Sequence, residues 1–157
     1  MFSGAGIKTF GSAVSAKGFT ISPGAAVDVT ASNHQLSLSG NFINSGSFNA
    51  RNGTVLLNGT TLQTIGGSST SDFYNLSLNN AVGSSLSASE NLLNVLSISN
   101  GTFSTNGQNF TMVSTASNTA RVAQITGSGD IIGNVTVQRF APGGTTGWAF
   151  IGTPLSS

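Results

Sequence analysis

The stretch RNGTVLLNGTTLQTIGG, residues 51–67, contains two Asn-Gly-Thr tripeptides that begin six residues apart. Asn-Gly pairs favour tight turns because both residues tolerate a positive φ. Only the four residues TVLL, at positions 54–57, separate the two pairs. Four residues are short for one strand of an antiparallel hairpin, so this stretch favours very short strands between frequent turns.

Short apolar segments, which we call apolar words, recur along the chain about every 20 residues. A period of that length indicates a repeat architecture. The spacing is 19, 21 and 20 residues for the pairs Leu36 and Val55, Leu57 and Leu78, and Leu76 and Leu96. The side chains of each word are expected to alternate between inside and outside, as in a strand with one buried face. The words are Phe19/Ile21, Val27/Val29, Leu36/Leu38, Val55/Leu57, Leu76/Leu78, Leu96/Ile98, Phe110/Met112 and Val135/Val137. No window has helical spacing, so we expect almost no helix.

Two architectures use strands of this kind. In a parallel β-solenoid (β-helix), each coil of roughly 20 residues stacks its short strands on the coil before it. In an antiparallel β-sandwich, the Asn-Gly pairs at 52–53, 58–59, 100–101 and 106–107 would close hairpins. The close spacing of these pairs favours the solenoid. We therefore predict an all-β parallel β-solenoid, with the antiparallel β-sandwich as the alternative.

Asparagine and glycine are the predicted corner residues of the coils. The structural turns that we expect are Asn52, Gly53, Asn58, Gly59, Asn100 and Gly101. We expect a positive φ at Gly53, Gly59, Gly66, Gly101 and Gly107, because glycine adopts that conformation at little cost. Stacked coils would also align some asparagine side chains into ladders.

Stacking is expected to hold such a fold together. A coil that buries a few aliphatic side chains gains roughly 1.5–3 kcal/mol for each, but ordering its residues costs about 1–2 kcal/mol apiece. Each coil therefore needs its neighbours. We assign residues 1–130 to solenoid coils and residues 131–157 to final strands leading into a following module. The sequence favours a segment of a longer chain, or a unit that abuts copies of itself.

The composition argues against several classes of protein. Charged residues make up 6% of the chain, the net charge is +1, and Gly, Ser, Thr and Asn account for about half of all residues. The scattered cations form no patch for nucleic acid, and no stretch approaches the roughly 20 apolar residues of a membrane span. The chain has no cysteine. We expect no metal, no cofactor, no nucleic-acid partner and no membrane span.

The polar chemistry offers few candidates for a site. The carboxylates Asp28, Asp72, Glu90 and Asp130 and the lone His34 are expected to be solvated residues, so we predict no catalytic residue. Tyr74 and Trp148 are the candidate glycan contacts, since an aromatic ring can stack on a sugar. Core packing is the expected role of five phenylalanines that lie inside apolar words, namely Phe42, Phe48, Phe73, Phe103 and Phe110.

At GNFINSGSFNARNGTVLLNGTTLQTIGGSSTSDFYNLSLNNAVGSSLS, residues 40–87, the sequence resembles a known family. The order GNF-N-G-F, NGTV-NG, Q-I-G and F-NL-NN is similar to the repetitive regions of very large surface proteins that gliding and related Bacteroidetes export by the type IX pathway. LLNVLSISNGTFSTNGQNFTMVS and the segment ending in WAFIGTPLSS are also similar to that family, so the resemblance covers nearly all of residues 10–157. It implies a secreted or cell-surface, adhesin-like or filament-forming protein. It brings no catalytic residues, and the sorting domain expected for that export route has no counterpart after Pro154.

From the residues and the resemblance together we expect an extracellular structural and adhesive protein segment. It would be a stiff cell-surface stalk or filament unit whose partners are copies of itself, neighbouring solenoid modules or polysaccharide. A carbohydrate-binding module is the first alternative, and a polysaccharide-degrading β-helix enzyme is the second. The enzyme would need at least two carboxylates that converge in a groove.

Overall fold

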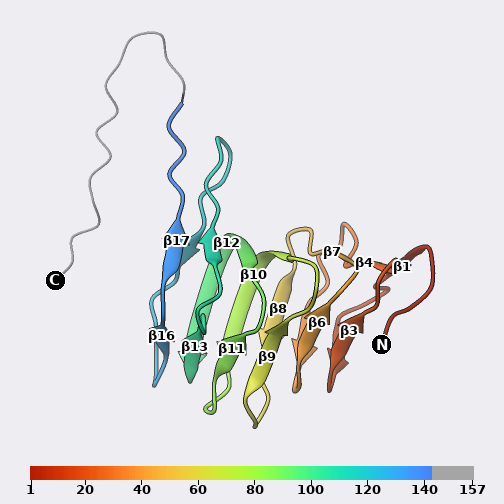
Figure 1. Cartoon of the computed structure of the whole chain (residues 1–157), viewed down its shortest axis with the longest axis horizontal. Coiled ribbons are helices and arrows are strands. Elements are labelled where there is room, and N and C mark those ends of the chain that lie inside the picture. Colours follow the sequence, from red (N-terminus) through yellow and green to blue (C-terminus); the bar gives the residue numbers. More distant parts are fainter. Residues whose placement is uncertain (143–157) are drawn as a thin grey trace, which may run out of the picture.

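The structure, a computed structural model, describes residues 1–142, which contain seventeen strands and no helix. Every pairing between these strands is parallel. The strands lie in two sheets that extend along the same stack of coils (Figure 1). The predicted parallel β-solenoid is therefore confirmed, and the alternative antiparallel β-sandwich is wrong.

Each coil contributes to three faces. The first face contains β1 (Ile7–Thr9), β4 (Ala26–Asp28), β7 (Ser47–Asn49), the starts of β10 (Asp72–Asn79) and β12 (Glu90–Asn100), β14 (Phe110–Met112) and β17 (Val135–Val137). The second face contains β2 (Val14–Ala16), β5 (Leu36–Leu38), β8 (Thr54–Leu57), the ends of β10 and β12, and β15 (Arg121–Val122). The third face is a separate sheet of β3 (Phe19–Ile21), β6 (Phe42–Asn44), β9 (Gln63–Gly66), β11 (Ser84–Leu86), β13 (Thr102–Ser104) and β16 (Asp130–Ile132).

The six strands of the third face define six coils, which we number 1 to 6 from the N-terminus. Figure 1 shows the strands of this face following one another in sequence order along the stack. Coils 4 and 5 differ from the others because β10 and β12 each run through the first and second faces without a break. At that bend the register between them slips by one residue, between Phe73 and Asn75. The long strands therefore give the middle of the solenoid its most continuous hydrogen bonding.

The apolar spacing in the sequence corresponds to the register of the coils. Leu36 pairs with Val55, Leu57 with Leu78, and Leu76 with Leu96 across successive coils. These are the three pairs whose separations indicated the repeat. Identical in-and-out alternation in each coil places these side chains in the interior, where all of them are buried. The sequence period is therefore the length of one coil.

Phenylalanine fills the interior of coils 1 to 4. The ring of Phe42 stacks on that of Phe19 with 5.5 Å between centroids, and contacts Phe48 and Phe73 edge-on at 5.2 and 5.1 Å. Phe103 and Phe110 form a second contact at 4.8 Å. The five phenylalanines assigned to the core, namely Phe42, Phe48, Phe73, Phe103 and Phe110, are all buried.

The predicted turn residues lie at coil corners, but some of the glycines act there for another reason than expected. Gly101 and Gly107 have the expected positive φ of 84° and 76°. The expectation is wrong for Gly53, Gly59 and Gly66, whose φ angles are not in the left-handed region. In RNG the left-handed residue is instead Arg51, with φ of 48°.

Close approach of neighbouring coils explains those three glycines. A Cβ on Gly53 would lie 3.0 Å from two carbonyl oxygens, that of Ala50 in the same coil and that of His34 in coil 2. A Cβ on Gly59 would collide with the carbonyl oxygen of Ser39, and one on Gly66 with the hydroxyl of Ser87. Backbone carbonyl groups therefore leave little space for a side chain at Gly53 and Gly59, whereas at Gly66, the last residue of β9, the obstacle is the Ser87 side chain.

The parallel stacking continues beyond residue 130. β16 pairs with β13 on the third face, and β17 pairs with β14 on the first face. The residues assigned to final strands thus begin inside β16. That they lead into a following module stays a prediction, and residues 143–157 lie outside the described part.

Candidate functional site

The bend shared by β10 and β12 is the most distinctive surface feature of the described residues. No loop interrupts the chain there, whereas in the other coils a loop or turn separates the strand of the first face from the strand of the second. In coil 2 the loop is residues 29–35, and in coil 6 it is residues 113–120, closed by an antiparallel bridge between Ser114 and Thr119. Figure 1 shows this second loop rising beyond β12. The bend, together with the short turn at residues 50–53 of coil 3, therefore forms a saddle between the longer loops of coils 2 and 6.

Tyr74 lies in the saddle, at the register slip of β10. It is half-buried and packs against the core. With Leu93, Val113, Thr115 and Asn118 it lines a small hollow of about 110 Å³, which we call the Tyr74 hollow. The side-chain amide of Asn118 donates to the carbonyl oxygen of Leu93 at 2.5 Å, which holds the coil 6 loop against β12. One of the two predicted glycan contacts is thus placed in a concave site.

A shallow polar groove of about 370 Å³ lies beside the Tyr74 hollow, and Leu93 lines both. Its polar walls include Asn49, Arg51 and Asp72. These side chains offer amide, guanidinium and carboxylate groups next to the apolar surface of the hollow. An aromatic ring flanked by such hydrogen-bonding groups is a combination suited to a polar ligand with an apolar face.

Outward-facing side chains on the first face form a column that alternates acid and amide. Register places Asp28 opposite Asn49, Asn49 opposite Asp72, and Asp72 opposite Asn91 in successive coils. The amide of Asn49 donates to Asp28 at 3.3 Å, and that of Asn91 donates to Asp72 at 2.8 Å. An amide therefore separates the two aspartates, which lie two coils apart.

Arg51 makes the only ion pair found among residues 1–142. Its Nε and Nη2 atoms donate to both carboxylate oxygens of Asp28, with the shortest distance at 2.7 Å. The hydrogen bonds from Arg51 hold the pKa of Asp28 below its usual 3.8, against the opposing effect of partial burial. Asp28 is therefore committed to a structural contact.

A second ladder of side chains runs along the bend. Asn94 donates to the side-chain oxygen of Asn75 at 2.9 Å, and Asn75 in turn lies 3.4 Å from the hydroxyl of Thr54. Arg121 extends the ladder to coil 6 by donating to Asn94 at 3.4 Å. The expectation that stacked coils align asparagine side chains is confirmed here.

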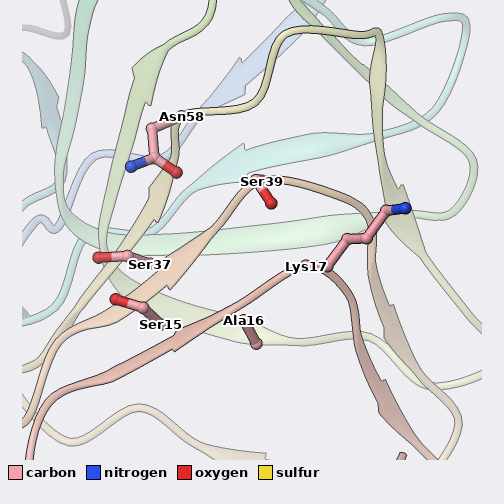
Figure 2. Close-up of a pocket in the computed structure, with 6 residues that line it drawn as sticks. All are labelled: Ser15, Ala16, Lys17, Ser37, Ser39 and Asn58. Carbon is pink, nitrogen blue, oxygen red and sulfur yellow. The ribbon is translucent and has the colours of Figure 1, made fainter.

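The second face carries a hollow of about 330 Å³ with a simpler lining. Figure 2 shows hydroxyls from Ser15, Ser37 and Ser39 on neighbouring coils, with Asn58 and the single cation Lys17 at its edge. Ser15 and Ser37 are directly opposite each other in the register of β2 and β5. In coils 1 and 2 this face therefore presents stacked hydroxyl groups, and Leu56 interrupts the stack in coil 3.

The other candidate residues are dispersed. Trp148 lies outside the described residues, so its relation to Tyr74 stays untested. His34 is half-buried in the coil 2 loop, and Asp130 begins β16 on the third face. Among residues 1–142 no group of three or more His, Cys, Asp or Glu side chains could hold a metal ion.

The predicted turn asparagines Asn52, Asn58 and Asn100 make no hydrogen bond to their own turn. Hydrogen bonds of this kind are made instead by Asn44, the last residue of β6, and by Asn80, directly after β10, whose Oδ1 atoms accept from the backbone N–H two residues later, each at 3.0 Å.

Sequence reasoning missed a buried amide network at the corner between the second and third faces. Gln63 donates to the carbonyl oxygens of Leu38 and Gly40, and its Oε1 accepts from the Gly59 N–H and from Asn80. All four hydrogen-bonding positions of its amide are thereby used. The alternation of side chains along the strand could have predicted that Gln63 is buried, because it lies two residues before the apolar Ile65 in β9 and both side chains therefore point to the same side.

Sequence reasoning was wrong about Glu90, which was expected to be solvated. Its side chain is fully buried, at 0% exposure. Glu90 has the same parity as Leu92 in the alternation of β12, so both face the interior. The alternation along β12 could therefore have predicted that Glu90 is buried.

Comparison with known proteins gave no relative. No family model matches the chain, and neither the curated proteins nor the solved structures include a significant match. No helix among the described residues is long and apolar enough to cross a membrane.

Proposed function

We propose that this chain is a segment of an extracellular structural and adhesive protein, a stiff cell-surface stalk or filament-forming unit that performs no chemistry. The observation that carries the proposal is the unbroken parallel stacking of coils 1 to 6. Each coil hydrogen-bonds its backbone to the next on all three faces, so bending the stack would strain many bonds together. Such a stack resists bending in the way that a structural element requires.

The surface supports the same proposal. Stacked hydroxyls on the second face and the asparagine ladders on the bend are neutral hydrogen-bonding groups, and salt screens them less than it screens charges. Their repetition from coil to coil suits contact with another repetitive surface. Copies of the chain, neighbouring solenoid modules and polysaccharide all present such surfaces.

Location and shape test this proposal together. Immunogold labelling of intact producing cells, with permeabilised cells as the comparison, is expected to place the chain outside the cell. Negative-stain electron microscopy of the native protein that contains the chain is expected to show a thin rod. Label found only after permeabilisation, or a compact particle, would contradict the proposal.

A carbohydrate-binding function is the second candidate, and the position of Tyr74 beside the polar groove favours it. A pyranose ring has an apolar face and a rim of hydroxyls, which matches an aromatic side chain next to Asn49, Arg51 and Asp72. The saddle spans several coils spaced about 4.8 Å apart, so it has room for a few sugar residues. By contrast, the carboxylates described here do not converge in a groove, and nothing in their placement favours the enzyme alternative.

Binding of the purified chain to a panel of neutral and acidic polysaccharides tests the second candidate. Tyr74→Leu removes the aromatic face but keeps an apolar side chain against the core, and it is expected to weaken binding about tenfold. Val82→Ala changes an exposed side chain at another corner and serves as the control. Equal affinities for the two variants and the parent would contradict a sugar site at Tyr74.

A further inference from the structure

Glu90 is an ionisable group inside the solenoid that neither proposed function uses. It begins β12, opposite Phe110 of coil 6, and its side chain points into the core beside Ser71 of coil 4. Ser71 is itself buried and accepts a hydrogen bond from Asn44 at 3.1 Å. We call this contact between Ser71 and Glu90 the Glu90 joint. It connects coils 4 and 5 in the middle of the stack.

The carboxyl group of Glu90 is poorly compensated for a buried acid. Its Oε2 accepts one hydrogen bond, from the Ser71 N–H at 2.5 Å. Its Oε1 is buried without any partner. Ionising a carboxyl group in such surroundings is costly, because burial removes water and a single hydrogen bond does not replace it.

Neighbouring charge adds to that cost. Asp72 on β10 is the charged side chain that acts on Glu90, and it repels a second negative charge. No cation pairs with Glu90, since the ion pair within residues 1–142 is that of Arg51 with Asp28. Burial first, and Asp72 to a smaller extent, raise the pKa of Glu90 from 4.5 to about 7, against the opposing effect of hydrogen bonding to Ser71.

We propose that the Glu90 joint is a pH-sensitive element, closed when the carboxyl group is protonated and loosened when it is ionised. The solenoid would then be most tightly stacked in mildly acidic surroundings and would open locally between coils 4 and 5 as the pH rises above neutrality. The sign follows from linkage. Between pH 4.5 and 7 the unfolded chain releases this proton while the folded chain retains it, so stability falls as pH rises. Over that interval the unfolding equilibrium constant increases on the order of a hundredfold.

Glu90 is the only glutamate in the chain, which allows its titration to be observed directly. Selective carbon-13 labelling of glutamate gives a single side-chain carboxyl signal in the folded protein. We expect that signal to titrate near pH 7. Titration near 4.5 would overturn the proposal, and this measurement needs no variant that must fold.

Hydrogen exchange tests whether the titration opens the joint. After correction for intrinsic exchange rates, peptides covering residues 71–79 and 90–100 are expected to lose protection about tenfold or more between pH 5.5 and 8.5. Peptides from coil 2 should change much less. Glu90→Gln should abolish the difference, while His34→Gln, a matched substitution to glutamine in the coil 2 loop, should retain it. Equal pH responses in the parent and Glu90→Gln would contradict the joint.

Discussion

In coils 1 to 4 the interior contains phenylalanine rings in mutual contact, whereas beside the start of β12 it contains an asparagine, a serine and a carboxyl group. Both regions are buried, and both lie between parallel strands with the same spacing. They differ in how their stability responds to conditions. Apolar contacts depend on shape and area, while a buried carboxyl group depends on pH. The comparison shows that a repetitive backbone does not impose a uniform core.

The largest expected effect is in the aromatic region. Phe42→Ala removes a fully buried ring that contacts Phe19, Phe48 and Phe73, and it should lower the free energy of unfolding by about 3–5 kcal/mol. Chemical denaturation followed by circular dichroism measures the loss. Phe140→Ala, at a half-exposed ring, is the matched control and should change little. Similar losses for the two variants would mean that the phenylalanine column does not carry the stability of coils 1 to 4.

The polar region should respond to pH by a comparable amount. Because the pKa of Glu90 is about 7 in the folded chain and 4.5 is the ordinary value, unfolding should become easier by about 3 kcal/mol between pH 4.5 and 8. Asp28 acts in the opposite direction and lower range, since its stabilising contact with Arg51 is lost only as pH falls below 3.8. Denaturation at several pH values measures both effects. A flat profile from pH 5 to 8 would remove the contrast between the two regions.

Spacing between coils should matter in both regions. Gly59→Ala places a methyl group against the Ser39 carbonyl oxygen and the Gln63 side chain, at an ordinary φ, and should cost about 1–3 kcal/mol. Gly11→Ala, where the added methyl group meets nothing within 4 Å, should be nearly neutral. Thermal unfolding of the two variants compares them. Equal melting temperatures would show that neighbouring coils can move apart at such corners at little cost in stability.

The smallest expected effect is on the surface ladder of the bend. Asn94→Ala removes hydrogen bonds to Asn75 and Arg121 and should cost about 0.5–1.5 kcal/mol. The exposed Asn134 provides the control substitution to alanine, with an expected change close to zero. Denaturant midpoints are sensitive enough to separate the two variants. A neutral Asn94→Ala would mean that solvent replaces the ladder without cost.

The sequence was most informative where alternation and spacing agreed. All eight predicted apolar words overlap a strand, and the TVLL segment between its two Asn-Gly pairs is β8 itself. Strands with one or no large apolar residue were not predicted, for example β7, with SFN, and β11, with SSL. Their partners in adjacent coils stabilise them, and such support is invisible in a local window.

The candidate site was less predictable than the fold. Tyr74 was identified as a potential contact from residue type alone, but its hollow exists because β10 slips by one residue and the coil 6 loop folds over β12. No sequence rule places a loop of coil 6 beside a residue of coil 4. The position of Tyr74 in its hollow therefore follows from the stacking of the coils and not from the local sequence.

The amino-acid sequence by itself determined the coil length, the inward-facing side chains of the apolar words and the absence of helix among residues 1–142, because alternation and period are local properties of a strand repeat. Only the tertiary structure decided that three faces enclose the core, that Arg51 takes the left-handed conformation near Gly53, and that Glu90 is buried. Each of these depends on which atoms the neighbouring coil brings near. Those atoms belong to residues roughly 20 positions away along the chain. Stacking of the coils brings them close, and the residues adjacent in sequence do not.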